Sequence, residues 1–224
     1  MKQKYNLLEV IQMTANLQRI FAIKLTAKVL FSLLLSSLGL GFYFIIDGQP
    51  SDAENKSGSF IVNKFSGKCI DVAGAPGTGN AAPLQLFDCE FSGRNRDNNS
   101  ETDHKWVITG DGFIKNTLSG KCIDVAGAPG KDNATKLQLF DCELSERNRD
   151  NNSETDQKWT ITSDGFIKNK LSGRCIDVAG APGTNNAAPL QLFDCELSGR
   201  NRDNNSQTDQ KWSLSKTPVP PTDQ

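Results

Sequence analysis

The sequence is poor in histidine and has no excess of charge of either sign. Its 224 residues include a single histidine, His104, and 25 Lys and Arg residues stand against 26 Asp and Glu residues. The formal net charge of -1 predicts no electrostatic attraction to nucleic acid or to acidic lipid. One histidine leaves little material for a His-dependent nucleophile or metal centre, which disfavours an enzyme.

The six cysteines include no CxxC pair, so a zinc ribbon or a thioredoxin-like site has little support. An even number of cysteines at regular spacing is typical of a protein from an oxidising compartment. We expect neither a cofactor nor a metal site.

An uncharged apolar run covers residues 29–46, after a basic lead at 1–28 and before an acidic linker at 47–56. This charge asymmetry predicts that the N-terminus stays inside. The run suits either a short membrane-spanning helix or the core of a signal peptide, and both alternatives export the rest of the chain. The Phe42-Tyr43-Phe44 cluster favours an uncleaved anchor, whereas Ser51-Asp52-Ala53 offers a cleavage site.

The strongest signal is an internal repeat of 53 residues, kept by Phe60, Phe113 and Phe166. We call residues 57–109 unit one, 110–162 unit two and 163–215 unit three. The proline-containing end, 216–224, is predicted to be a disordered tail. Repeats this regular indicate one supersecondary unit used three times around a shared core. The tryptophans at the equivalent place in the units are Trp106, Trp159 and Trp212.

Each unit has the two-residue period of β-strands. In Trp159-Thr160-Ile161-Thr162 apolar and polar residues alternate, so the tryptophan faces the core. Turn signals such as Asp164-Gly165 separate four short strands per unit, about twelve in all, and no helix is expected between 57 and 215. Closing three such units around an axis removes most free strand edges, which predicts an all-β threefold barrel. A linear solenoid is the alternative, but distinct capping repeats are missing.

The cysteines of each unit are 20 residues apart. Pairing within units gives three equivalent loops, each stabilising by about 3 kcal/mol in the chain-entropy model. The repeat therefore predicts the disulfides Cys69–Cys89, Cys122–Cys142 and Cys175–Cys195.

The same alternation places an acid, an amide and an aromatic ring of each unit on one outward face. The three sets are Asp71, Gln85 and Phe87; Asp124, Gln138 and Phe140; and Asp177, Gln191 and Phe193. A carboxylate accepts hydrogen bonds from adjacent hydroxyls, an amide donates and accepts, and a ring stacks on an apolar C–H face. Together these groups suit a sugar. The alternative is that the acid caps a turn, the amide is solvated and the ring covers the disulfide.

The order Cys-Ile-Asp-Val, Leu-Gln-Leu-Phe-Asp-Cys and Asp-Gln-Lys-Trp resembles the ricin-type lectin family, whose repeats carry a Q-x-W signature on a β-trefoil. The resemblance covers all three units and implies shallow pockets for galactose- or xylose-type sugars. It implies that these pockets are lined by the acid, amide and ring of each unit and by the polar residue before Q-x-W, which is Asp103, Asp156 or Asp209. It gives a structural role to the three tryptophans and to Gln157 and Gln210.

The chain departs from the family pattern in four ways. Phenylalanine stands where the family usually has tryptophan, and aspartate stands at Asp103 and its equivalents where asparagine is common, adding a second carboxylate. The stretch from the second cysteine to the tryptophan, 90–105 in unit one, is longer than usual, and His104 replaces the signature glutamine. Because imidazole has only one donor and one acceptor in a fixed geometry, we expect unit one to be the weakest site.

Oxygen-bearing side chains recur at every second position of 97–103, a spacing that can wrap Ca²⁺. The central Gly and the bidentate Glu of an EF-hand are missing, which favours a solvated turn.

Among functions, a glycan-binding lectin competes with a trefoil scaffold whose loops bind protein and with a carboxylate hydrolase. Threefold repetition of one residue set favours the lectin.

Overall fold

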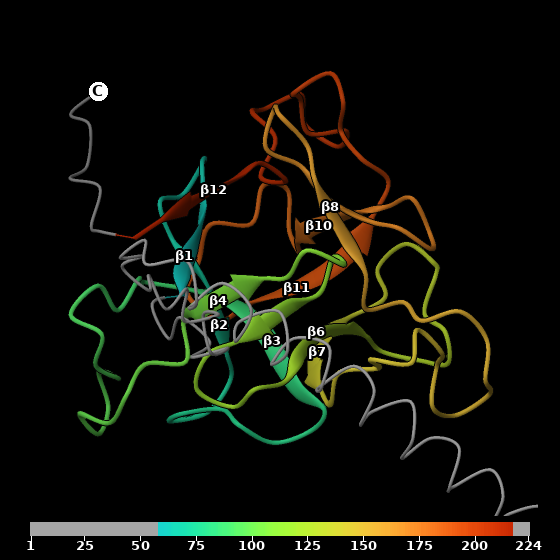
Figure 1. The fold of residues 1–224 in the computed structure, drawn as a ribbon. Coiled ribbons are helices and arrows are strands. Elements are labelled where there is room, and N and C mark those ends of the chain that lie inside the picture. Colours follow the sequence, from blue (N-terminus) through green and yellow to red (C-terminus); the bar gives the residue numbers. More distant parts are fainter. Residues whose placement is uncertain (1–57, 217–224) are drawn as a thin grey trace, which may run out of the picture. The chain divides into compact units, whose positions relative to one another are not determined.

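The computed structural model describes residues 58–216, and within this range every residue lies in a strand or a loop and none in a helix. Twelve short strands follow one another, the number that the repeat predicts (Figure 1). They are β1 (Ser59–Asn63), β2 (Cys69–Val72), β3 (Ala82–Phe87), β4 (Lys105–Ile108), β5 (Ile114–Asn116), β6 (Cys122–Val125), β7 (Leu137–Phe140), β8 (Trp159–Ile161), β9 (Ile167–Asn169), β10 (Cys175–Val178), β11 (Ala188–Phe193) and β12 (Trp212–Ser215).

The first and last strands of the units form a closed ring. Antiparallel pairing joins β12 to β1, β1 to β4, β4 to β5 and β8 to β9. Single bridges, Phe113 with Lys158 and Phe166 with Lys211, link β5 to β8 and β9 to β12. The six strands therefore return to their starting point, and this closure leaves no free edge along the ring.

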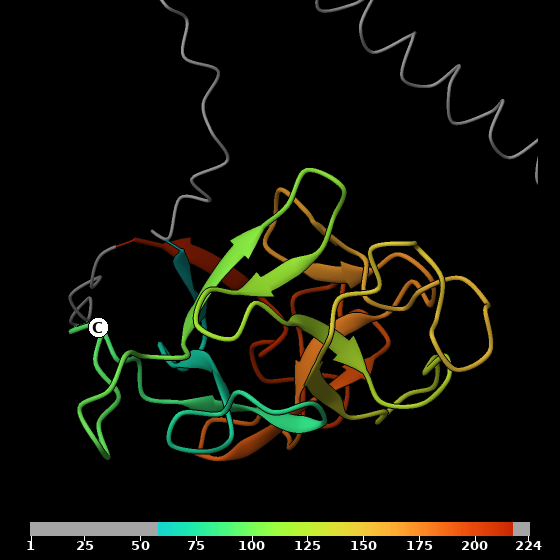
Figure 2. The ribbon, with the colours of Figure 1, turned by 60° about the horizontal axis from the view of Figure 1, so that its bottom comes forward.

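The inner strands of each unit form hairpins that meet one another. β2 pairs with β3, β6 with β7 and β10 with β11. β3 also pairs with β7 and with β11, and a bridge between Lys136 and Gln191 joins β7 to β11. Figure 2 shows these hairpins from another side. The contacts repeat with threefold symmetry, so the solenoid alternative is wrong.

Side chains also link each unit to the next. The Asn80 amide donates to Asp141 Oδ2 at 2.9 Å, Asn133 donates to Asp194 Oδ2 at 3.0 Å, and Asn186 donates to Asp88 Oδ2 at 2.9 Å. The three bonds run from unit one to two, from two to three and from three back to one.

The core is built from the inward residues that the alternation predicts. Isoleucine, valine and leucine side chains of all units pack with the three tryptophans. Each indole N–H is satisfied by a buried carbonyl: Trp106 donates to Ile70 O at 3.2 Å, Trp159 to Ile123 O at 3.1 Å and Trp212 to Ile176 O at 3.2 Å. The tryptophans thus lie in the core with their N–H groups satisfied, on the inward face that the strand alternation predicts. The three predicted disulfides, one within each unit, are also present.

The predicted lead at 1–28, the apolar segment at 29–46 and the linker at 47–56 lie outside the described residues, as does the tail after residue 216. Within 58–216, no helix has the length and apolar character needed to cross a membrane.

The Ala-Pro-Gly loop after the second strand of each unit packs too tightly for any side chain at its glycine. In unit two, a Cβ on Gly130 would lie 2.5 Å from Val125 Cγ1 and 2.6 Å from the carbonyl oxygen of Ala126. Backbone cannot move aside cheaply, so the loop requires glycine here.

We therefore expect Gly130→Ala to lower the free energy of unfolding by about 1–3 kcal/mol, measured as a lower urea midpoint. Gly110→Ala is the matched control, because a Cβ there meets nothing within 4 Å. Equal midpoints for the two variants would contradict this packing.

Candidate functional site

The floor of each candidate site is a hairpin that brings the predicted acid and amide together. Asp71 on β2 stands directly opposite Gln85 on β3, and the amide Nε2 donates to Asp71 Oδ2 at 2.6 Å. The equivalent bonds are 2.7 Å from Gln138 to Asp124 and 2.8 Å from Gln191 to Asp177. The two-residue period of the strands puts both side chains on one face.

The predicted aromatic ring lies at the edge of the same floor. Phe87 is half-buried and stands opposite Cys69, so the ring lies beside the disulfide. In units two and three an arginine covers the ring: Arg149 Cζ is 5.7 Å from the Phe140 centroid, and Arg202 Cζ is 5.9 Å from the Phe193 centroid. The strand alternation gives no indication of these arginines. They come from the long stretch between the second cysteine and the tryptophan of each unit, 90–105 in unit one, which we call the inserted loop.

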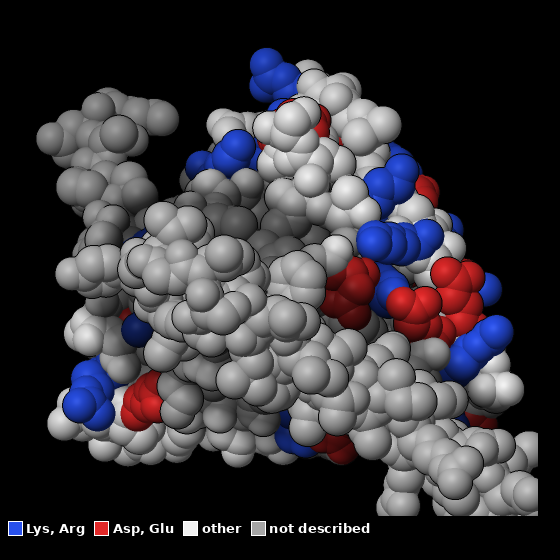
Figure 3. Space-filling view, viewed as in Figure 1, with Lys and Arg blue, Asp and Glu red and all other residues white. Residues whose placement is uncertain are grey.

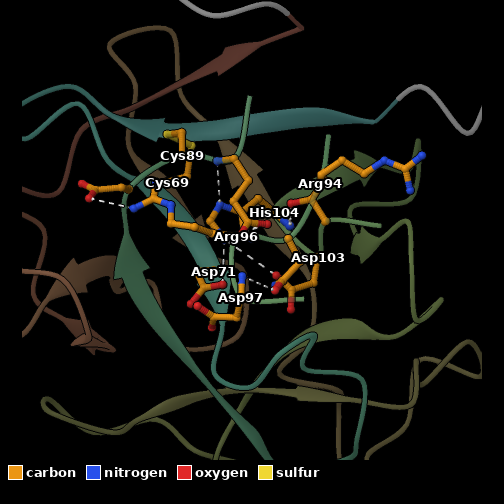
Figure 4. Close-up of polar contacts among 12 residues, drawn as sticks. Cys69, Asp71, Cys89, Arg94, Arg96, Asp97, Asp103 and His104 are labelled. Atoms are coloured by element: carbon orange, nitrogen blue, oxygen red, sulfur yellow. Dashed lines mark hydrogen bonds and ion pairs between the residues drawn. A yellow bond between two sulfur atoms is a disulfide. The ribbon is translucent and has the colours of Figure 1, made fainter. Parts of the chain in front are cut away.

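A hollow of about 310 Å³ lies above this floor in unit one. The floor residues, together with Gly74 and Ala75 after β2, form part of its wall, and the inserted loop forms the rest. Its lining consists of Asp71, Gly74, Ala75, Gln85, Phe87, Glu90, Asn95, Arg96, Asp97 and His104. Figure 4 shows Asp71, Asp97 and His104 gathered at this place.

Asp103 does not line this hollow, in contrast to the role that the resemblance gives it. Its side chain is 0 % exposed, and Oδ2 accepts a hydrogen bond from the Gly77 backbone N–H at 2.6 Å. Asp156 and Asp209 bind Gly130 and Gly183 in the same way, at 2.9 Å and 2.7 Å. These aspartates lie beneath the floor and hold the Ala-Pro-Gly loop in place.

The floor acids are also less accessible than an outward-facing strand position suggests, since Asp71 is only 5 % exposed. The inserted loop covers it. Glu90 anchors the base of that loop by accepting from the Arg96 backbone N–H at 2.6 Å, and the Asn98 amide reaches across to donate to Ala75 O at 2.6 Å. Sequence reasoning missed Glu90; the signal was a glutamate directly after the second cysteine of every unit, repeated as Glu143 and Glu196.

His104 imitates the glutamine that it replaces. In unit two, Gln157 Oε1 accepts from the Glu143 N–H at 2.8 Å, and Nε2 donates to Asp124 Oδ1 at 3.0 Å and to Asp141 O at 3.1 Å. In unit one, His104 Nδ1 accepts from the Glu90 N–H at 3.4 Å, and Nε2 lies 2.8 Å from Asp71 Oδ1. Imidazole therefore supplies two of the three bonds, one of them longer.

Each unit buries a second carboxylate beside the floor acid, and this raises its pKa. Loss of hydration raises the pKa of Asp103, Asp156 and Asp209 to about 7, and the neighbouring charge of Asp71, Asp124 or Asp177 adds to the effect. Burial also raises the pKa of Asp177 to about 6. One oxygen of each buried acid, Oδ1, has no partner unless it carries the hydrogen itself. The protonated acid is therefore the form that suits this environment near neutral pH.

Asp71, Asp103 and His104 each place one potential metal ligand within 4.8 Å of the others. However, Nδ1 of His104 accepts a backbone N–H, so Nε2 carries the ring hydrogen and points it at Asp71. That arrangement leaves His104 no free lone pair for a metal. In the loop considered for Ca²⁺, Asn95 Oδ1 accepts from the Asp97 N–H and Asn98 Oδ1 from the Ser100 N–H, which are turn contacts.

The buried acids generate a pH prediction. A carboxyl whose pKa is about 7 in the folded protein, against about 3.9 when unfolded, binds more protons folded than unfolded. Stability should then fall as the pH rises from about 4 to 7. We expect the Asp156→Asn/Asp209→Asn double variant to lack much of this fall and to exceed the parent in free energy of unfolding by at least about 1 kcal/mol at pH 8.

Urea unfolding at pH 5 and pH 8 measures the effect, with Asp150→Asn, at an exposed loop aspartate of unit two, as the control. A double variant that is less stable than the parent at pH 8 would show that the buried acids are ionised and well paired.

The comparison of units one and two generates another prediction. His104→Gln should restore the third hydrogen bond, to the carbonyl of Asp88, and raise the free energy of unfolding by about 1 kcal/mol. Gln157→His, the reverse change in unit two, should lower it by a similar amount. Thermal unfolding checks both, and shifts of the same sign would contradict the equivalence of the two positions.

A family model described as the ricin-type beta-trefoil lectin domain matches residues 58–185 and 114–218, which together span all three units. The two matches overlap because the units are alike.

Two curated relatives share part of the chain. The galactose/N-acetylgalactosamine-binding lectin CEL-III of Pseudocnus echinatus is 29 % identical over 170 residues, 73 % of this chain and 33 % of the relative. Nigrin b of Sambucus nigra is 27 % identical over 127 residues, 57 % of this chain and 18 % of the relative. The chain thus spans a third or less of the length of these relatives.

Solved structures support the fold. The mdaA-1 domain has a TM-score of 0.54 and 18 % identity, over 72 % of this chain and 90 % of that one. The designed threefold-symmetric protein ThreeFoil has a TM-score of 0.50 and 22 % identity, over 71 % of this chain and 98 % of that one.

Proposed function

The chain belongs to the ricin-type β-trefoil lectin family, and from this premise we propose that residues 57–215 form a non-enzymatic lectin domain with up to three sites for galactose- or xylose-type sugars. The observation that carries the proposal is the acid–amide pair with an adjacent ring, repeated in every unit. The relative CEL-III is a galactose/N-acetylgalactosamine-binding lectin, which supports the sugar class.

The chemistry of the floor suits a sugar with adjacent hydroxyls. Gln138 holds Asp124 Oδ2 and Gln157 holds Oδ1, so the carboxylate is fixed in orientation while spare lone pairs remain on both oxygens. Phe140 is half-buried and has the Arg149 guanidinium over its ring, so the part of the ring that stays exposed offers an apolar contact for C–H groups. The ligand groups are therefore positioned before binding, which lowers the entropic cost of recognition.

Units two and three are the stronger sites in this proposal. Their floor acids are each held by two amide side chains, whereas in unit one the second amide is replaced by the imidazole of His104. Each site covers little ligand area, so we expect weak binding of a monosaccharide and a large gain when one polymer engages two sites.

We predict that Asp124→Ala and Asp177→Ala each lower binding to an immobilised galactose-type glycan, that the double variant loses far more than either, and that Asp71→Ala matters least. The reason is the loss of the carboxylate acceptors in the two stronger sites. Surface plasmon resonance on a glycan surface gives the ranking.

The floor acids also accept hydrogen bonds from neighbouring amides, so replacing them can disturb the floor itself. Phe140→Ala/Phe193→Ala is therefore the companion variant, because it removes two of the aromatic rings and leaves the carboxylates in place. Circular dichroism confirms that each variant is folded. A folded Asp124→Ala/Asp177→Ala variant that binds like the parent would refute these sites and favour a protein-binding scaffold instead.

We also propose that the lectin domain lies outside the cytoplasm, either anchored through residues 29–46 or secreted. Three disulfides in the described residues support an oxidising compartment. The basic lead at 1–28 supports the orientation with the N-terminus inside.

A further inference from the structure

A second hollow lies on the inserted loop, next to the hollow above the floor. In unit three its volume is about 370 Å³, and in unit one an equivalent hollow has about 390 Å³. The lining in unit three consists of Cys195, Glu196, Leu197, Ser198, Arg200, Asn201, Arg202 and Asn205. We call this the loop hollow.

The loop hollow adjoins the sugar site. In unit one, Glu90, Asn95 and Arg96 line both the loop hollow and the hollow above the floor, so the two share a wall. Figure 4 shows the side chains of Arg94 and Arg96 pointing in opposite directions. A saccharide chain that extends from the floor site over these shared residues would meet Arg94 in unit one, or Arg200 in unit three.

The loop hollow of unit three combines an apolar surface with an arginine that has no acidic partner in the described part of the chain. Leu197 is 74 % exposed, and Arg200 Nη1 makes a single long contact of 3.4 Å with Asn205 O. The acid in the lining, Glu196, is buried and turns Oε1 to the backbone N–H of Arg202 at 2.8 Å. Most N–H groups of Arg200 remain available to a ligand.

The units differ in charge at this hollow. Opposite the arginine, the bridge partner is Gln207 in unit three, whereas it is Glu101 in unit one and Glu154 in unit two. The turn residue is Gly199 in unit three, and Glu146 in unit two, where it pairs with Lys158.

In unit three the equivalent lysine, Lys211, lies beside the small Gly199. Gln207 and Gly199 of unit three both stand where unit two has a glutamate. Unit three therefore has the most positive loop hollow and unit two the least positive. Figure 3 shows basic side chains, with acidic ones beside them, at the top of the face, where Figure 1 places the loop after β11.

We propose that the loop hollow of unit three is a second saccharide subsite that takes an anionic substituent, sulfate or carboxylate, on the sugar next to the one in the floor site. The proposal rests on the lectin function proposed above. Arg200 binds the anion by charge-assisted hydrogen bonds, and Leu197 contacts the C–H face of the same sugar. The protein is then selective for acidic galactose-type polysaccharides.

Calorimetric titration with a sulfated galactan oligosaccharide, its desulfated counterpart and an oligogalacturonate tests this on the full chain. We expect the anionic ligands to bind more tightly than the neutral one, and Arg200→Gln to lower their affinity about fivefold while leaving the neutral ligand unchanged. Whichever anionic ligand loses more affinity in Arg200→Gln identifies the preferred group, sulfate or carboxylate. Gln207→Glu should reproduce part of the loss.

Unit two supplies the matched gain-of-function control. Glu146→Gly/Glu154→Gln gives it the residues of unit three at both positions and should raise the number or affinity of anionic sites, with neutral binding unchanged. Equal affinity of sulfated and desulfated ligands for the parent, or equal competition by polyglutamate, would overturn the subsite alone. Absence of binding by all three saccharides would instead overturn the lectin function.

Discussion

The buried aspartate of each unit is the constraint on which the site depends. In unit two, the side-chain Oδ2 of Asp156 accepts the N–H of Gly130, and the backbone carbonyl oxygen of Asp156 accepts the Asn169 amide of the next unit at 2.5 Å. One residue therefore connects the Ala-Pro-Gly loop, the floor of the candidate site and the neighbouring unit. Its place is kept in all three copies, where Asn116 and Asn63 bind Asp103 and Asp209.

Burying two acids side by side costs stability, and the fold offsets that cost by lowering their charge. A carboxylate without a partner is expensive in a low-dielectric interior, whereas a neutral acid can donate its hydrogen to the adjacent carboxylate. The raised pKa of Asp156 follows from this physical preference. The floor acid Asp124 then remains the acceptor, held from both sides by Gln138 and Gln157.

The sequence predicted those parts of the fold and site that a two-residue period controls. Facing positions of a hairpin follow from alternation, so the sequence predicts the places of Asp71, Gln85 and the buried tryptophans. The sequence does not predict the depth of the site, because the inserted loops have no period. Glu90 acts through a contact to the backbone N–H of Arg96 within the same loop, and Asn98 acts through a contact to the carbonyl oxygen of Ala75 on another segment. Such contacts depend on where the loop lies in space, and strand spacing does not encode that.

Closure of the ring also determines how the three candidate sites are spaced. Figure 1 shows the inserted loops at three separate sides of the β-fold, and paired strands, not flexible linkers, join the units. The spacing between sites is therefore rigid. For flexibly linked sites the effective concentration is set by the linker, but here it is set by the ligand, which must span the fixed distance. In the proposed lectin, a rigid threefold array would therefore discriminate between glycans by their repeat length and stiffness as well as by the sugar that enters each floor site.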